Sequence, residues 1–165
     1  MTLTGGDLPR RTLVLGLGNP ILSDDAVGLQ VARCLKAELA GDPWVEVDED
    51  FNGGLRLMER LAGYDRAVII DAILSGAAPG TVHLLSAGSM PTQRTVCAHD
   101  VSLPTALAMG RRGGLSLPET AEIHVIAIEA ADVMTFGEEL TPAVAAAVPL
   151  AVQAARQALQ GDAHA

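Results

Sequence analysis

The sequence predicts an α/β fold in which a single domain has three layers: a mostly parallel, twisted sheet of about five strands, with helices on both of its faces. Two patterns lead to this prediction. Short apolar runs alternate along the chain with longer segments whose apolar residues recur every three or four positions. These are the patterns of strands and of amphipathic helices, and their alternation builds parallel strands joined by helical crossovers. The length of 165 residues suits one domain spanning 1–165, with loose ends expected at 1–10 and 161–165.

Five segments have the pattern of strands. A strand that is buried on both faces has no polar side, so it forms a short continuous run of apolar residues. The expected strands are 11–17, a strand beginning at 45–47, 66–71, 81–85 and 121–129. Asp71 and Glu129 stand at the carboxyl ends of two of these runs, where open α/β sheets bind their ligands.

Four segments have the pattern of helices. They are expected from residue 23 or 24 to 40, and at 55–62, 103–112 and 142–160. Ser23 or Asp24 can cap the first of these helices, and Thr141 can cap the last. Cys34 falls within the first helix and is expected to be a small buried residue.

The composition narrows the classes of partner. With 20 acidic and 11 basic residues the chain has a net charge of −9, so neither nucleic acid nor an anionic membrane is expected as a partner. Neither Cys34 nor Cys97 belongs to a Cys-x-x-Cys pair, which favours a reducing compartment. Residues 1–10 lack the apolar segment of a signal peptide, and no apolar run approaches the roughly 20 residues of a membrane span. A cytoplasmic protein is expected.

The turn after the first strand is the most informative part of the chain. It reads Gly-Leu-Gly-Asn-Pro over residues 16–20, and Asp24 and Asp25 follow where the first helix begins. A nucleotide-binding turn keeps this position free of acid, because the phosphate lies there. Two carboxylates in its place predict that the turn holds a cation or a basic group.

Three residues are expected to meet at the carboxyl edge of the sheet. Asp25 follows the first strand, Asp71 ends the third, and His99 lies in the loop before the helix at 103–112. Each has an ordinary structural explanation, since an acid stabilises a helix N-terminus and an aspartate or histidine caps a turn. Together, two carboxylates and an imidazole suit a divalent transition metal such as zinc or nickel, with positions left open for substrate or water. Cys97 could serve as a fourth ligand or as a nucleophile.

These residues resemble the hydrogenase maturation endopeptidases, the proteases that trim the large subunit of nickel–iron hydrogenases. The matching pieces follow one another in order over nearly the whole chain, and the first two form the most specific block. They are Gly16-Leu-Gly-Asn19, Asp24-Asp25-x-x-Gly28, Gly53-Gly54, Asp71-Ala72, Pro79-Gly80, His99, Glu129 and Leu140-Thr-Pro142. The first metal-contacting position is glutamate in some members and aspartate here, and Ala130 stands where many members have proline after Glu129.

The resemblance implies a cytoplasmic endopeptidase that cuts a large-subunit precursor once, near its C-terminus, after nickel has been inserted. The metal-contacting positions of the family match Asp25, Asp71 and His99, and Asp25 and Asp71 would also be the catalytic residues. The nickel would be carried by cysteines of the substrate, with no organic cofactor. Either the metal or a carboxylate base could activate the water. The irregular segment 86–97 is expected to shape the choice of substrate.

Two other functions use the same residues. A non-enzymatic maturation chaperone would sense nickel on Asp25, Asp71 and His99 without cutting its partner. A nucleotide-binding enzyme would use the turn Gly16-x-Gly18, but the third glycine of the dinucleotide fingerprint is replaced by Ile21, and the two aspartates would repel a pyrophosphate. The resemblance favours the endopeptidase over both.

Overall fold

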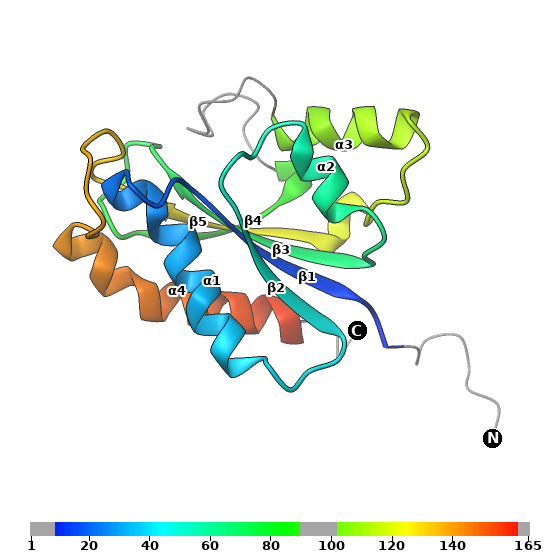
Figure 1. Cartoon of the computed structure of the whole chain (residues 1–165), viewed down its shortest axis with the longest axis horizontal. Coiled ribbons are helices and arrows are strands. Elements are labelled where there is room, and N and C mark those ends of the chain that lie inside the picture. Colours follow the sequence, from blue (N-terminus) through cyan, green and yellow to red (C-terminus); the bar gives the residue numbers. More distant parts are fainter. Residues whose placement is uncertain (1–8, 90–101, 162–165) are drawn as a thin grey trace.

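The computed structural model describes residues 9–89 and 102–161, which form one five-stranded sheet with the strand order β2-β1-β3-β5-β4 (Figure 1). β1, β2, β3 and β5 are paired in parallel, and the edge strand β4 runs antiparallel to β5. The strands are β1 (Thr12–Leu17), β2 (Val45–Asp50), β3 (Arg66–Ile73), β4 (Val82–Ser86) and β5 (Ile123–Glu129). The prediction of a mostly parallel sheet of about five strands is confirmed.

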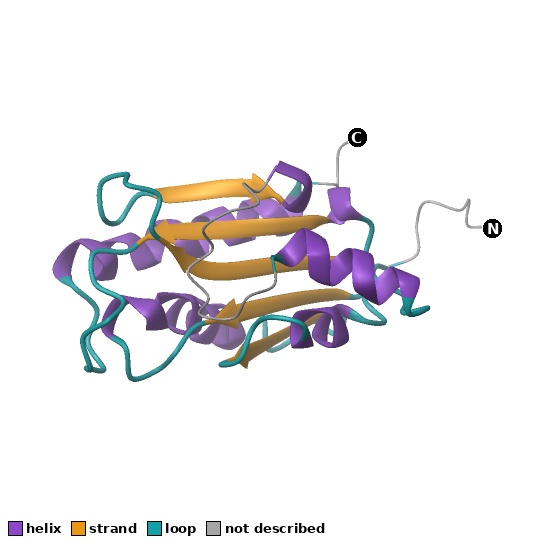
Figure 2. Cartoon of the chain, turned by 90° about the horizontal axis from the view of Figure 1, so that it is seen from above, coloured by secondary structure: helices purple, strands orange, loops and turns teal. Residues whose placement is uncertain are grey.

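Helices cover both faces of the sheet, as predicted: α1 and α4 lie on one face and α2 and α3 on the other (Figures 1 and 2). The helices are α1 (Val27–Glu38), α2 (Arg56–Leu61), α3 (Leu103–Arg112) and α4 (Pro142–Gln160), and the short 3-10 turns are η1 (Ser23–Ala26), η2 (Ala87–Ser89) and η3 (Thr120–Glu122). Within the described ranges, none of these helices combines the length and the hydropathy that crossing a lipid bilayer requires.

The alternation of side chains along the central strands divides the core into two halves. In β1, Val14 packs toward α1 and α4, whereas Leu13 and Leu15 pack toward α2 and α3. In β3, Ile70 packs toward α1 and α4, whereas Ile69 packs toward α2 and α3. Every residue of β1 and of β3 is buried. This explains why both strands are mostly apolar in the sequence, with Thr12, Arg66 and Asp71 as their polar residues.

Two expectations about single residues are wrong. Cys34 is exposed, because the buried stripe of α1 runs through Val31, Ala32 and Leu35 and leaves the positions between them to solvent. Asp71 does not end its strand, since β3 continues to Ile73 and stays paired with β5. The loose ends expected at 1–10 and 161–165 fall mostly outside the described residues.

The expected helix cap is wrong for α1, and for α4 it is right only in its position. The N-cap position of α1 is Ala26, and neither Ser23 nor Asp24 caps the helix with its side chain. Thr141 does occupy the N-cap position of α4, but its side chain makes no capping bond. The side chains of Asp24 and Thr141 bind each other instead, as described below.

The start of α1 lies directly against the sheet, and glycine makes this possible. A Cβ atom at Gly28 would clash with the carbonyl oxygens of Leu17 in β1 and Ile70 in β3, and one at Gly16 would clash with the carbonyl oxygen of Gly28. The backbone of the helix therefore touches the backbone of two strands where both approach their carboxyl ends. This contact fixes Asp25, one helical turn before Gly28, over the junction of β1 and β3.

We expect Gly28→Ala to lower the free energy of unfolding by about 1–3 kcal/mol or more, because backbone atoms on both sides of the added methyl group cannot rotate away. Gly41→Ala is the matched control, since a Cβ atom there meets nothing within 4 Å, and its effect should stay within about 1 kcal/mol. Denaturant unfolding of both variants measures the difference. Equal stabilities would contradict the close packing of α1 on the sheet.

Candidate functional site

The order in which the chain adds strands to the sheet reverses between β1 and β3. The chain leaves β1 through α1 to reach β2 on one side, and returns through α2 on the opposite face to reach β3 on the other side. The crevice at the carboxyl ends of two such strands is where open α/β sheets bind ligands. Asp25 follows β1 and Asp71 belongs to β3, so both predicted residues belong to the strands that border this crevice.

Asp25 lies in η1 and is half-buried. Its Oδ2 accepts a hydrogen bond of 2.9 Å from the backbone N–H of Asn19. Burial raises the pKa of Asp25 above its ordinary value, and the hydrogen bond from Asn19, which favours the charged form, opposes the shift only in part. The surroundings of Asp25 therefore stabilise its negative charge only in part.

Asp71 lies inside β3 with 5% of its surface exposed. Its Oδ1 accepts a hydrogen bond of 2.8 Å from the backbone N–H of Ala72. Because side chains alternate along a strand, Asp71 shares a face with Ile69 and belongs to the α2 and α3 side of the sheet. This is the side on which α3 begins, directly after the loop that contains His99.

The structure brings Asp25 and Asp71 to the same part of the sheet. The turn η1 that carries Asp25 contacts β3, and the residue before Asp71, Ile70, touches the backbone of α1 at Gly28. His99 lies outside the described residues, as do Cys97 and most of the segment 86–97. Among the described residues, no three histidine, cysteine, aspartate or glutamate side chains form a group that could hold a metal ion. Further ligands at this edge would have to come from the rest of the chain or from a partner.

Asp24 has a different role from the one predicted. It is fully buried, and its carboxylate accepts hydrogen bonds from the N–H groups of Ala131 (2.9 Å), Asp132 (2.9 Å) and Thr141 (2.7 Å) and from the hydroxyl of Thr141 (2.8 Å to Oδ2). These donors belong to the segment that joins β5 to α4. The expectation that Asp24 faces a cation is wrong, because its oxygens are already bound by protein donors; it anchors that segment beside η1.

Glu129, at the end of β5, anchors a second loop. It is 2% exposed, and it accepts hydrogen bonds from the N–H and the hydroxyl of Ser75 (2.8 and 2.7 Å) and from the N–H of Gly76 (3.0 Å). His83 Nε2 lies 3.8 Å from its Oε2. Burial alone would raise the pKa of Glu129, but the hydrogen bonds from Ser75 and Gly76 and the nearby His83 outweigh it, and the pKa is lowered. Nothing in the sequence marks Ser75 as the partner of Glu129.

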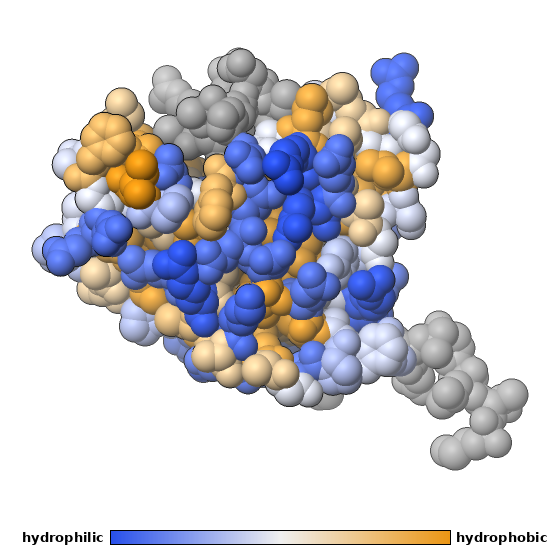
Figure 3. Space-filling view, viewed as in Figure 1, coloured by the Kyte–Doolittle hydropathy of each residue, from blue (hydrophilic) through white to orange (hydrophobic). Residues whose placement is uncertain are grey.

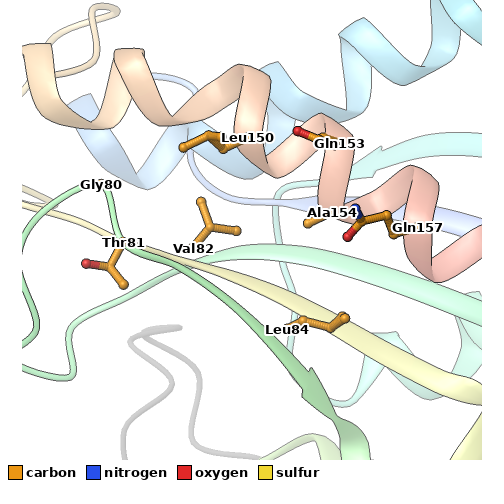
Figure 4. A pocket seen from close by; sticks show the side chains of 8 residues that line it. All are labelled: Gly80, Thr81, Val82, Leu84, Leu150, Gln153, Ala154 and Gln157. Carbon is orange, nitrogen blue, oxygen red and sulfur yellow. The ribbon is translucent and has the colours of Figure 1, made fainter.

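A hollow of about 510 Å³ lies elsewhere, between β4 and α4 (Figure 4). Its lining consists of Gly80, Thr81, Val82, Leu84, Leu150, Gln153, Ala154 and Gln157. None of these side chains is ionisable, so the hollow offers no group for acid–base or metal chemistry. The site is therefore better placed at the junction of β1 and β3.

The carboxyl edge of the sheet is acidic. No lysine or arginine occurs in 12–32, 67–93 or 113–155, the three segments that contain the loops following β1, β3 and β5. Asp25, Asp71 and Glu129 lie in these segments. A surface of one sign concentrates ions of the opposite sign, so the edge attracts cationic partners.

Comparisons with known proteins agree on one family. A family model described as hydrogenase maturation protease matches residues 29–158. The hydrogenase 2 maturation protease of Escherichia coli (strain K12) is 32% identical over 127 residues, which cover 70% of this chain and 77% of that protein. The hydrogenase expression/formation protein HupD of Rhizobium leguminosarum bv. viciae is 25% identical over 153 residues, covering 91% of this chain and 74% of that protein.

Solved structures give the same result. The hydrogenase maturating endopeptidase HybD from E. coli superposes with a TM-score of 0.78 at 27% identity, covering 93% of this chain and 94% of that chain. The [NiFe] hydrogenase maturation protease HybD from Thermococcus kodakarensis has a TM-score of 0.64 at 32% identity, covering 89% and 97%. Fold and sequence thus point to the same set of proteins.

The two neighbouring aspartates should respond differently to the same substitution. Asp24→Asn should lower the free energy of unfolding by about 2–3 kcal/mol. The NH2 group of asparagine would face buried N–H groups, such as those of Ala131 and Thr141, which need an acceptor. Asp25→Asn should change it by less than about 1 kcal/mol, because burial already disfavours the charge that this substitution removes. Denaturant unfolding at neutral pH compares the two variants. A larger loss for Asp25→Asn than for Asp24→Asn would contradict this assignment of roles.

Glu129 should make stability depend on acid pH. Since folding lowers its pKa, its contribution is complete above the ordinary glutamate value of about 4.3 and is lost as the pH falls through the lower folded value. Glu129→Gln should therefore be clearly less stable than the parent at pH 7, and the gap should narrow below about pH 4.3. Thermal unfolding from pH 3 to pH 7 measures this difference in stability, with Glu59→Gln, at an exposed residue, as the control. A gap that is independent of pH would rule out this role for the charge.

Proposed function

The chain belongs to the hydrogenase maturation protease family and is a protease, and from this premise we propose that it removes the C-terminal extension of a nickel–iron hydrogenase large-subunit precursor after nickel has been inserted. The observation that carries the proposal is the placement of Asp25 and Asp71 at the junction of β1 and β3, where the loops following β1, β3 and β5 contain no lysine or arginine. The name of the Thermococcus relative, a [NiFe] hydrogenase maturation protease, supports the class of substrate.

In this proposal, Asp25, Asp71 and His99 bind nickel that the precursor already holds on its own cysteines. Thiolates suit nickel as ligands, and carboxylate and imidazole groups can occupy the positions that the thiolates leave open. The incompletely stabilised charge of Asp25 supports this role, because a cation from the substrate would compensate it. The nickel is part of the substrate, so the same site would recognise the nickel-loaded precursor and cleave it.

Asp25 and Asp71 are also the proposed catalytic residues. Hydrolysis adds hydroxide from water to the scissile carbonyl carbon, and the water's other proton finally reaches the departing amide nitrogen. A carboxylate beside the peptide bond can accept that proton from water and return it to nitrogen. Binding of nickel by the same pair would hold the neighbouring peptide bond in a fixed position, which lowers the entropic part of the barrier.

Intact-mass spectrometry of a cognate large-subunit precursor tests the proposal. We expect a single loss of mass from the C-terminus with nickel-loaded precursor and none with nickel-free precursor. Asp25→Asn and Asp71→Asn should each reduce the rate at least 100-fold, which is the scale of a general acid–base contribution, while Glu59→Gln should cleave at the parent rate.

Three outcomes would contradict parts of the proposal. Equal cleavage of nickel-free precursor would contradict nickel recognition. Full activity of both aspartate variants would contradict their catalytic role. Tight binding of nickel-loaded precursor without any loss of mass would favour a nickel-sensing chaperone over a processing enzyme for this substrate.

A further inference from the structure

Three large apolar side chains are exposed at the acidic edge of the sheet. Ile21 has 49% of its surface exposed, Met134 has 80%, and Phe136 has 79%. They come from the turn after β1 and from the segment that joins β5 to α4, and Figure 3 shows apolar surface gathered over that segment. Methionine and aromatic residues are enriched in the cores of protein interfaces, and a cluster of them in water favours association.

Hydrogen bonds between the two segments hold this apolar surface in place. The N–H of Gly137 donates to the carbonyl of Ile21 (3.0 Å), and the N–H of Ser23 donates to the carbonyl of Gly137 (2.9 Å). The N–H groups of Met134 and Thr135 donate to Oδ1 of Asp132 (both 2.9 Å). The segment is thus an ordered turn whose apolar side chains project outward. Such preorganisation reduces the entropy that a partner's binding would cost.

The surface is continuous with the proposed active site. The N–H of Ile21 donates to Oδ1 of Asn19 (3.1 Å), and the N–H of Asn19 donates to Oδ2 of Asp25 (2.9 Å). Only one residue therefore separates the apolar surface from the carboxylate of Asp25. A protein substrate that reached Asp25 would therefore pass close to Ile21.

The charges around the surface indicate which kind of partner would be complementary to it. The exposed residues Glu138 and Glu139 lie two and three positions after Phe136, and no lysine or arginine occurs in 12–32 or 113–155. A complementary partner presents apolar side chains flanked by cationic groups. A second copy of this acidic segment would place like charges against each other, which disfavours pairing between two copies.

We propose that Ile21, Met134 and Phe136 form a docking surface for an apolar segment of the hydrogenase precursor, flanked by basic residues, and that this surface determines the affinity for the substrate but not the chemical step. The proposal rests on the proposed function, since it takes the precursor as the partner. The contacts are the same in the bound substrate and in the transition state, so they act on KM alone.

The double variant Met134→Gln/Phe136→Gln tests the proposal, with Leu150→Gln as matched control because Leu150 is 58% exposed and belongs to α4. With cognate nickel-loaded precursor, we expect the double variant to raise KM at least tenfold and to change kcat less than twofold. Leu150→Gln should change neither. Equal melting temperatures of all three proteins exclude unfolding as the cause, since each replaced side chain is exposed.

The outcomes separate this proposal from the proposed function. If the parent cleaves the precursor and the double variant has an unchanged KM, or a reduced kcat alone, the docking surface is disproved while the function stands. If the parent cleaves no nickel-loaded precursor, the function fails, and direct binding of the same precursor to parent and double variant decides the docking surface separately. A parent that sediments as a dimer, with a double variant that sediments as a monomer, would identify the surface as a contact between two copies and overturn the proposal.

Discussion

The contact between the backbone of α1 and the carboxyl ends of β1 and β3 is the constraint on which the rest of the site depends. Gly28 allows the first turn of the helix to touch the carbonyl oxygens of Leu17 and Ile70, and Gly16 removes the side chain that would face the helix from below. A helix held further from the sheet would carry Asp25 away from β3, the strand that contains Asp71. The two glycines therefore have a positional role. They allow the turn that carries Asp25 to approach the strand that contains Asp71, and they take no part in the chemistry themselves.

The local geometry of η1, the turn that leads into this contact, explains why the neighbouring residues Asp24 and Asp25 have opposite roles. They lie in a 3-10 turn, where successive side chains are about 120° apart, so Asp24 can point into the protein while Asp25 faces the edge. Asp24 is satisfied by four donors from the β5–α4 segment, whereas Asp25 receives one from Asn19. Ser23 before them has a φ of +34°, a strained conformation for a non-glycine residue. Its N–H and hydroxyl, bound to the carbonyls of Gly137 and Glu139, hold it there.

The sequence was sufficient for the fold because its signals are local. Apolar runs and helical periodicity predict the elements, and the rule that parallel strands share a carboxyl edge predicts that Asp25 and Asp71 approach each other. The anchors could not be predicted in this way. Asp24 binds residues more than 100 positions away, and Glu129 binds Ser75 across the sheet, so no spacing in the sequence records either contact. Cys34 was misplaced because periodicity alone defines an apolar stripe only to within about one residue.

The acidic edge connects these structural roles to the order of events in the proposed reaction. The loops that follow β1, β3 and β5 contain no lysine or arginine, and burial makes the charge of Asp25 more costly than in water. Under the proposed function, a nickel-loaded precursor offers a metal ion that the carboxylate of Asp25 can bind, whereas a nickel-free precursor offers none. In the proposed reaction, the cost of the Asp25 charge would be relieved only when the metal is present, so this cost would contribute to the difference between the two binding free energies. A site balanced by an internal lysine would be more stable and would lose that discrimination.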